Sequence, residues 1–292
     1  MTTVLEPSLR PLPHPVTPFP GETMSSYMDR LANANHLDTV ALRRYVAGKK
    51  QARVVPIDRL SIVTGVQART LERAISDPSD ISPLLKYHPF DGDRSIMIRP
   101  FVSTLACRLC VAARGAAGPV ISWRPAERVV CVTHRRWIGS DDALQPSLDR
   151  QPDVLKAHRQ HLRLVRRHGR DEVTAAFTVA ADICRYWRDG RQHDDDFNRR
   201  LEIFHGPDWR VPPYSATVAA AAYPQVVALT RLLVSPYWKS LATNPSPDNQ
   251  SVFGIEVRRS VARTFVWPQH RESKDPLYRW LVGDVQFGRQ RR

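Results

Sequence analysis

The sequence predicts a mainly α-helical protein with a small β zinc ribbon: an N-terminal helix-turn-helix, a central zinc-binding module and a helical C-terminal domain. Two observations lead to this fold class. Apolar residues recur at helical spacing over most of the chain, and one central stretch carries two close pairs of metal-binding side chains. The chain has 292 residues, 42% of them hydrophobic, which suffices for two or three small domains.

The expected domains follow from changes in composition along the chain. They are a Pro-rich extended arm (1–18), a helical helix-turn-helix domain (19–90), a zinc ribbon module (91–142), a helical C-terminal domain (143–280) and a basic tail (281–292).

The charge balance is strongly basic, with 43 Lys and Arg against 29 Asp and Glu and a formal net charge of +14. Such a balance implies an anionic partner, of which nucleic acid is the commonest, although a generally solvated basic surface is the alternative. Residues 1–16 carry no apolar signal segment, and residues 216–234, the most apolar run, are interrupted by polar residues and Pro224. We therefore expect a cytoplasmic protein without a membrane span. Cys184 is left over from the metal-binding pairs, so disulfides are not expected.

Six prolines between residues 7 and 20 exclude a helix there. This segment is expected either to run extended along a surface or a partner, or to be a disordered lead-in. Helical spacing begins at Met24 and predicts a helix to about Leu37. Asp38 can cap a second helix, which passes through Tyr45 and is ended by Gly48.

Two further short helices are predicted around a Gly65-Val66 turn. Pro56 suits the first turn of the earlier helix, and Ala68, Leu71, Ala74 and Ile75 define the inner face of the later one. A helix, a glycine-containing turn and a helix over residues 57–76 indicate a helix-turn-helix, with an ordinary helical hairpin as the alternative. The side chains expected to point outward toward DNA are Gln67, Arg69, Thr70 and Arg73.

The most specific pattern is Cys107-x-x-Cys110 followed by Cys131-x-x-His134, with each pair expected on a tight turn. Three thiolates and one imidazole complete a tetrahedral zinc sphere, so the ion is expected to be structural and to leave no site for a reactive water. A zinc deaminase would need an H-x-E motif and a proline before the first cysteine, but Ala106 stands there and no H-x-E occurs. No Walker A loop, G-x-S-x-G motif or two-metal acid set is present. We predict no catalytic residues.

Pro152 opens a second helical region, whose two helices are separated at Gly169. The first is heavily basic and has no acid between Val154 and Arg170; it either lies along phosphates or is a solvated face. Arg163, Arg166 and Arg167 are its candidate nucleic-acid contacts. A third helical block is expected over about 216–242, followed by a loop from Asn244 to Asn249.

Two separated stretches resemble the TniQ family. Phe19-Pro20-Gly21-Glu22-Thr23 and the residues to Asn35 are similar to its opening P-G-E-[ST]-x-x-S-[WY]-x-x-R-x-A-x-x-N pattern. Its second hallmark is C-x-x-C, then S-W-R, then C-x-x-H, which appears here as Cys107 to Cys110, Ser122-Trp123-Arg124, and Cys131 to His134. The resemblance covers roughly residues 18–140.

The resemblance implies a non-enzymatic transposition accessory protein that helps to select the insertion target. Its implied partners are DNA, an AAA+ transposition ATPase and a transposase or RNA-guided effector complex; a second copy of the chain is a further candidate. It also implies that the four Cys and His residues are the zinc ligands and that residues 57–76 match the family helix-turn-helix. Two other functions stay open. One is a zinc-containing transcriptional regulator that binds operator DNA directly, and the other is a protein-interaction module whose helix-turn-helix never touches DNA.

Overall fold

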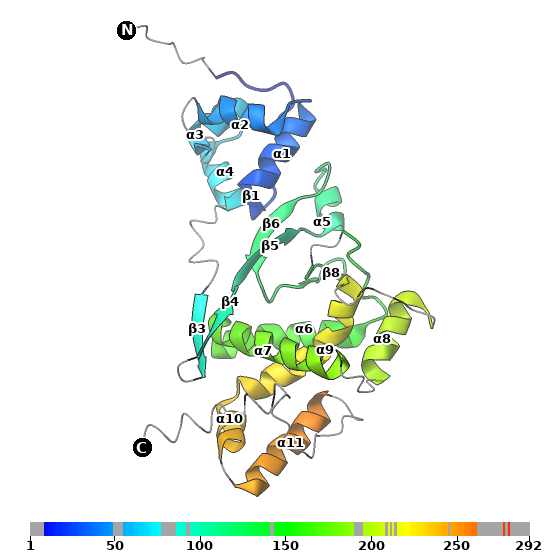
Figure 1. Cartoon of the computed structure of the whole chain (residues 1–292). Coiled ribbons are helices and arrows are strands. Elements are labelled where there is room, and N and C mark those ends of the chain that lie inside the picture. Colours follow the sequence, from blue (N-terminus) through cyan, green and yellow to red (C-terminus); the bar gives the residue numbers. More distant parts are fainter. Residues whose placement is uncertain are drawn as a thin grey trace. The chain divides into compact units, whose positions relative to one another are not determined.

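In the computed structural model the chain forms two compact units (Figure 1). Unit 1 comprises Met1–Leu84 and Phe101–Arg124, and unit 2 comprises Leu85–Pro100 and Pro125–Arg292. The described residues are 9–48, 55–76, 86–91, 94–140, 143–189, 195–207, 210, 212, 215–244, 246–261, 277 and 280. They are mostly helical, with small sheets, which confirms the fold class in its coarse form. The helix-turn-helix identity and the five-part domain layout stay predictions.

Four short helices build the first part of unit 1. They are α1 Met24–Ala34, α2 Thr39–Ala47, α3 Ile57–Thr64 and α4 Ala68–Ala74. The predicted caps are present: Asp38 accepts a hydrogen bond from the Ala41 amide at 2.8 Å, and Gly48 ends α2. Gly65 ends α3 in the left-handed conformation, with φ of 68°, which glycine adopts at little cost. The inner faces form one core of Tyr27, Met28, Leu31, Ala32, Leu42, Val46, Val55, Leu60, Val63, Leu71 and Ile75.

A four-stranded sheet adjoins these helices in the order β2-β1-β6-β5. Its strands are β1 Glu22–Thr23, β2 Ile75–Ser76, β5 Phe101–Leu105 and β6 Ile121–Pro125, and the short helix α5 Arg108–Ala113 follows β5. β1 pairs parallel with β2 and antiparallel with β6. Just before β1, Gly21 has φ of 75°, and a Cβ there would lie 3.1 Å from the carbonyl oxygen of Trp123. The turn into β1 therefore requires glycine.

The proline-rich segment from Leu9 to Pro20 runs without helix along unit 1 and is held by hydrogen bonds to its backbone. The Asn35 side chain both accepts from the His14 amide and donates to the His14 carbonyl. The Leu12 amide donates to the Val63 carbonyl at 2.8 Å, and the Tyr27 hydroxyl donates to the Val16 carbonyl at 2.8 Å. Of the two alternatives, the extended arm therefore holds for residues 9–20. Residues 1–8 lie outside the described part.

Unit 2 is built around one apolar helix. Its helices are α6 Pro152–His168, α7 Arg170–Asp189, α8 Asp195–His205, α9 Ala216–Leu233, α10 Pro236–Thr243 and α11 Pro247–Val261. Its strands are β3 Lys86–Asp91, β4 Arg94–Ile98, β7 Val130–Cys131 and β8 Arg136–Trp137, in the pairs β3-β4 and β7-β8. α9 contacts α6, α7, α8, α10 and α11. As predicted, Pro152 opens α6 and Gly169 ends it.

α9 is long and apolar enough to cross a membrane by length and composition alone, and among the described helices it is the one candidate. However, 78% of its apolar window is buried inside the protein. A core helix passes the same test, and its contacts with five other helices explain its composition.

The structure corrects several predicted boundaries. α1 ends at Ala34 and does not reach Leu37, because the Asn35 side chain turns to the carbonyls of Leu31 and His14. Ile75 lies in β2 and not in the helix before it. The predicted 244–249 loop ends early, since Pro247 begins α11. Cys107 and Cys110 lie on the first turn of α5, where a tight turn was expected. The basic tail 281–292 lies outside the described residues.

Candidate metal centre

The first ligand pair is positioned by the start of α5. Cys107 caps this helix, its carbonyl accepts a hydrogen bond from the Val111 amide at 3.0 Å, and only 4% of the residue is exposed. Cys110 follows three residues later, and residues at this spacing lie on the same side of a helix. Both thiols can therefore point toward one ion.

The second pair lies on the turn between β7 and β8. Cys131 ends β7, and His134 precedes Arg135, which has φ of 45° in the left-handed region. This turn brings the Cys131 Sγ to 3.6 Å from the His134 Nδ1. Sulfur and nitrogen at this separation are compatible with two ligands of one ion.

The ligand atoms of Cys107, Cys110, Cys131 and His134 all lie within 4.8 Å of one another. Four ligands at zinc distances of about 2.0–2.3 Å in a tetrahedron stand about 3.3–3.8 Å apart, so only a small contraction would be needed. Three thiolates and one imidazole are a soft donor set that suits zinc. When bound, zinc would be held by four protein ligands and would have a structural role. The four residues thus form a cluster that can hold a metal ion, as predicted.

The candidate DNA-contacting residues of α4 are all exposed. Gln67 immediately precedes the helix, while Arg69, Thr70 and Arg73 lie on its surface. Leu71 points the other way into the core, with 0% exposure. Arg69 and Arg73 stand one turn apart, so their guanidinium groups lie on one face. Their role in DNA binding stays a prediction.

The candidate residues of α6 are exposed as well. Arg163, Arg166 and Arg167 lie on the side of the helix opposite the buried residues Ala157 and His161. Their contact with nucleic acid stays a prediction.

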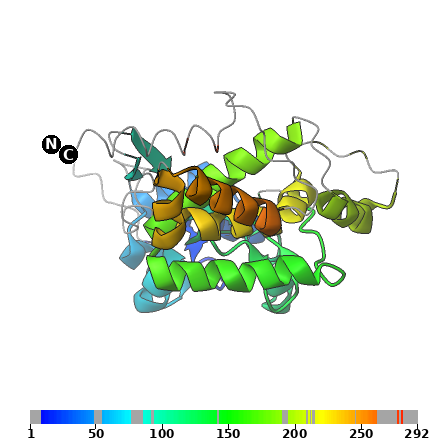
Figure 2. The ribbon, with the colours of Figure 1, turned by 90° about the horizontal axis from the view of Figure 1, so that it is seen from below.

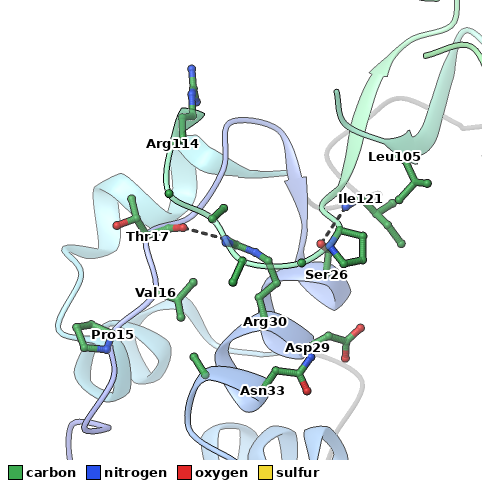
Figure 3. A pocket seen from close by; sticks show the side chains of 16 residues that line it. Pro15, Val16, Thr17, Ser26, Asp29, Arg30, Asn33, Leu105, Arg114 and Ile121 are labelled. Carbon is green, nitrogen blue, oxygen red and sulfur yellow. Dashed lines mark hydrogen bonds between the residues drawn. The ribbon is translucent and has the colours of Figure 1, made fainter. Parts of the chain in front are cut away.

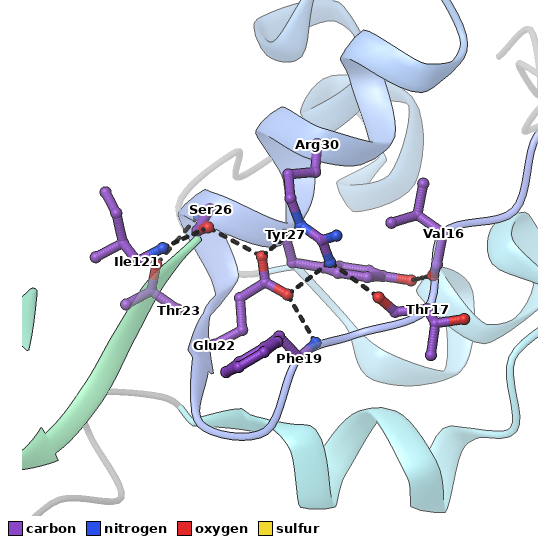
Figure 4. Close-up of polar contacts among 9 residues, drawn as sticks. All are labelled: Val16, Thr17, Phe19, Glu22, Thr23, Ser26, Tyr27, Arg30 and Ile121. Atoms are coloured by element: carbon purple, nitrogen blue, oxygen red, sulfur yellow. Dashed lines mark hydrogen bonds and ion pairs between the residues drawn. The ribbon is translucent and has the colours of Figure 1, made fainter. Parts of the chain in front are cut away.

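Two polar features of unit 1 were not predicted as a site. One is a buried ion pair, in which Arg30 binds both carboxylate oxygens of Glu22 (Figure 4). The other is a cavity of about 590 Å³ between the arm, α1 and the loop after α5 (Figure 3). Arg30 and Ser26 line this cavity, and Ser26 also accepts a hydrogen bond from the Ile121 amide at 3.0 Å. Both residues belong to the motif 19–35, which was the only signal for them in the sequence.

Unit 2 holds a buried aromatic and histidine cluster that the sequence did not indicate. The Tyr223 hydroxyl lies 2.9 Å from the Nδ1 of His161 and 3.4 Å from that of His158. Burial, with a contribution from the nearby positive Arg128, lowers the pKa of His158 to about 4. Burial, with a contribution from His158, lowers the pKa of His161 to about 3. Both imidazoles are therefore neutral at pH 7.

The fold and the ligand cluster define a mainly helical protein with a small Cys₃His module. Residues 13–137 match the TniQ family model, so this part of the chain is similar to the TniQ family. The TniQ family is generally non-catalytic, and a match to it implies a transposition-associated accessory protein. No curated protein and no solved structure matches the chain. The match ends before α6 begins, so α6 to α11 lie outside it.

Proposed function

We propose that this chain is a non-catalytic adaptor that helps to select the insertion target in DNA transposition, linking target DNA or a target-recognition complex to an AAA+ ATPase and its transposase. The observation that carries the proposal is the TniQ match over residues 13–137. That stretch contains both the α3-α4 helix pair and the Cys₃His cluster. The proposed place of action is the cytoplasm.

The proposed DNA contact in the family domain is α4 as a recognition helix. Arg69 and Arg73 are exposed on one face, and Gln67 and Thr70 add side chains that can hydrogen-bond to base edges. Leu71 anchors the opposite face in the core shared with α1 to α3, so the helix is presented on a packed support. The net charge of +14 favours association with a polyanion such as DNA.

The α4 contact is tested with the Arg69→Ala/Arg73→Ala double variant in the full chain. If both arginines bind phosphates, the slope of log affinity against log salt should fall by about 1.8, because each lost phosphate contact removes about 0.9. Arg44→Ala is the matched control, since Arg44 is exposed on α2 of the same unit. An unchanged affinity and slope in the double variant would remove α4 from DNA recognition.

The adaptor role is tested by association with a purified AAA+ transposition ATPase, at physiological salt and with ATP present. Stable association that depends on residues 13–137 would support the proposal. Sequence-specific DNA binding without any ATPase association would favour the direct operator-binding regulator. ATPase association without DNA binding would favour the form of the adaptor that docks on a separate recognition complex.

A further inference from the structure

The outer face of α6 carries a continuous row of cations, here called the α6 basic face. It consists of Lys156, Arg159, Arg163, Arg166 and Arg167, all of them exposed. At 100° per residue these positions fall within an arc of about 100°, and from first to last they extend over about 16 Å of helix axis. Figure 2 shows α6 in green along one side of the helices of unit 2. The row is therefore a single surface and not a scatter of charges.

The opposite face of α6 is fixed in the core. Val154, Ala157, His158, His161 and Leu164 are buried, and the helix packs against α7 and α9. A cationic surface on such a support does not have to fold when its partner arrives, so binding costs less ordering entropy than binding by a flexible basic segment.

Both ends of α6 are also tied down. At its start, the Asp153 carboxylate accepts from Arg200 Nε at 2.6 Å, and Gln151 donates to the Arg200 carbonyl at 2.8 Å. Just beyond its end, Arg170 donates to both carboxylate oxygens of Glu127 at 3.0–3.2 Å. These contacts place the helix, and they engage the carboxylates of Asp153 and Glu127.

The cations of the α6 basic face have no acidic partner within the described part of the chain. Other arginines of unit 2 do: Arg185 pairs with Asp182, Arg199 with Asp196, and Arg231 with Glu256. The helix itself carries one acid, Asp153, and Arg200 binds it. Five neighbouring positive charges without compensation repel one another, so an external polyanion is favoured there.

The residues of the α6 basic face favour a nucleic acid duplex over an anionic membrane surface as the partner. A helix that lies on a membrane surface inserts an apolar face into the lipid, but the apolar face of α6 is already buried in unit 2. A nucleic acid duplex instead presents a regular row of phosphates, which long lysine and arginine side chains reach without inserting anything. The face consists of long cations, which can neutralise phosphates at any sequence.

We propose that the α6 basic face binds the phosphate backbone of duplex DNA without sequence preference, as a second contact outside the TniQ match. This proposal rests on the proposed function only because it takes DNA as the partner. The helix α6 itself lies beyond residue 137, where the TniQ match ends. Such a contact adds affinity at any target, and sequence choice is left to α4 or to a separate recognition complex.

The test uses the full chain with Arg159, Arg163 and Arg166 replaced by glutamine, which keeps helix propensity and removes three charges. The matched control is Arg185→Gln/Arg199→Gln/Arg258→Gln, an equal charge loss at exposed positions on α7, α8 and α11 of the same unit. Two 20-base-pair duplexes of unrelated sequence are titrated between 50 and 200 mM salt. Circular dichroism checks that both variants stay folded.

We expect the α6 variant to lose affinity at least tenfold for both duplexes and its salt slope to fall by about 2.7, at about 0.9 per phosphate contact. The control should change little. Equal losses in the two triple variants, a loss confined to one duplex, or unchanged binding would each overturn the proposal. The Arg69→Ala/Arg73→Ala variant in the same titration separates the two contacts. Unchanged binding by that variant would remove α4 as a recognition helix but would leave the proposed α6 contact unaffected.

Discussion

Arg30 donates hydrogen bonds from Nε and Nη2 to the two carboxylate oxygens of Glu22, each at 2.9 Å, and both side chains are buried (Figure 4). Glu22 also accepts from the Phe19 amide at 2.9 Å and from the Ser26 hydroxyl at 2.9 Å. Arg30 Nη2 further donates to the Thr17 carbonyl. One ion pair therefore joins the arm, β1 and α1.

Breaking this pair should destabilise unit 1. Arg30→Ala leaves the Glu22 carboxylate buried without its cation, and losing one partner of a buried pair costs about 3–5 kcal/mol. Chemical denaturation monitored by circular dichroism measures the loss. Arg185→Ala is the control, because its pair with Asp182 is half exposed and such pairs contribute about 0–1 kcal/mol. Equal effects of the two substitutions would show that the buried pair contributes no more than an exposed one.

The extended arm should depend on the Asn35 side chain. Asn35→Ala removes two hydrogen bonds to the His14 backbone and one to the Leu31 carbonyl, so we expect faster proteolysis within residues 9–17 and a stability loss of about 1–2 kcal/mol. Asn33→Ala is the matched control, since Asn33 is exposed on the same helix and its side chain makes no hydrogen bond to the described residues. Identical cleavage rates in both variants would contradict the anchoring role.

Acid should destabilise unit 2 through its buried histidines. The pKa of His158 is lowered to about 4 and that of His161 to about 3, so the unfolded state, near 6.5, binds their protons first. Stability is then full above about pH 6.5 and falls as pH drops toward 4 and 3, by up to about 1.4 kcal/mol per pH unit for each group.

His161→Asn removes one of the two buried imidazoles that take up a proton on unfolding. The free energy of unfolding should therefore decline less steeply between pH 6.5 and 4. His36→Asn serves as the control: His36 is exposed in unit 1 with φ of 54°, which asparagine tolerates. The measurement is the free energy of unfolding as a function of pH. The same slope in the His161 variant and the wild type would contradict the account.

Much of the helical fold follows from local signals. Asp38, Gly48, Gly65, Pro152 and Gly169 mark helix ends in the sequence, and each does so in the structure. These residues act through their own backbone preferences or through bonds to residues close in sequence, and such effects can be predicted without knowledge of the fold.

Long-range contacts could not be predicted in the same way. The parallel pairing of Glu22 with Ile75 joins strands of two residues each, which are too short to show a hydrophobic alternation. The cluster of Tyr223 with His158 and His161 depends on α6 packing against α9, more than 60 residues apart in sequence. The Cys₃His cluster was an exception, because metal ligands are rare residue types in a fixed spacing.

Metal binding at the Cys₃His cluster should be specific to its four residues. Cys110→Ser removes one thiolate that lies within 4.8 Å of the other ligand atoms, so metal affinity and the thermal stability that it supplies should both fall. Cys184→Ala is the control, because Cys184 is a buried thiol in the α7 core and lies outside the cluster. Loss of metal from the Cys184 variant would place the ion elsewhere.

The most direct measurement of the central claim is native mass spectrometry of the full chain, purified without added metal and compared with the Cys110→Ser variant. One Zn²⁺ per wild-type chain, lost in the variant and retained in Cys184→Ala, is the predicted result, because Cys107, Cys110, Cys131 and His134 supply one complete ligand set. A wild-type chain that is folded and free of metal would contradict it.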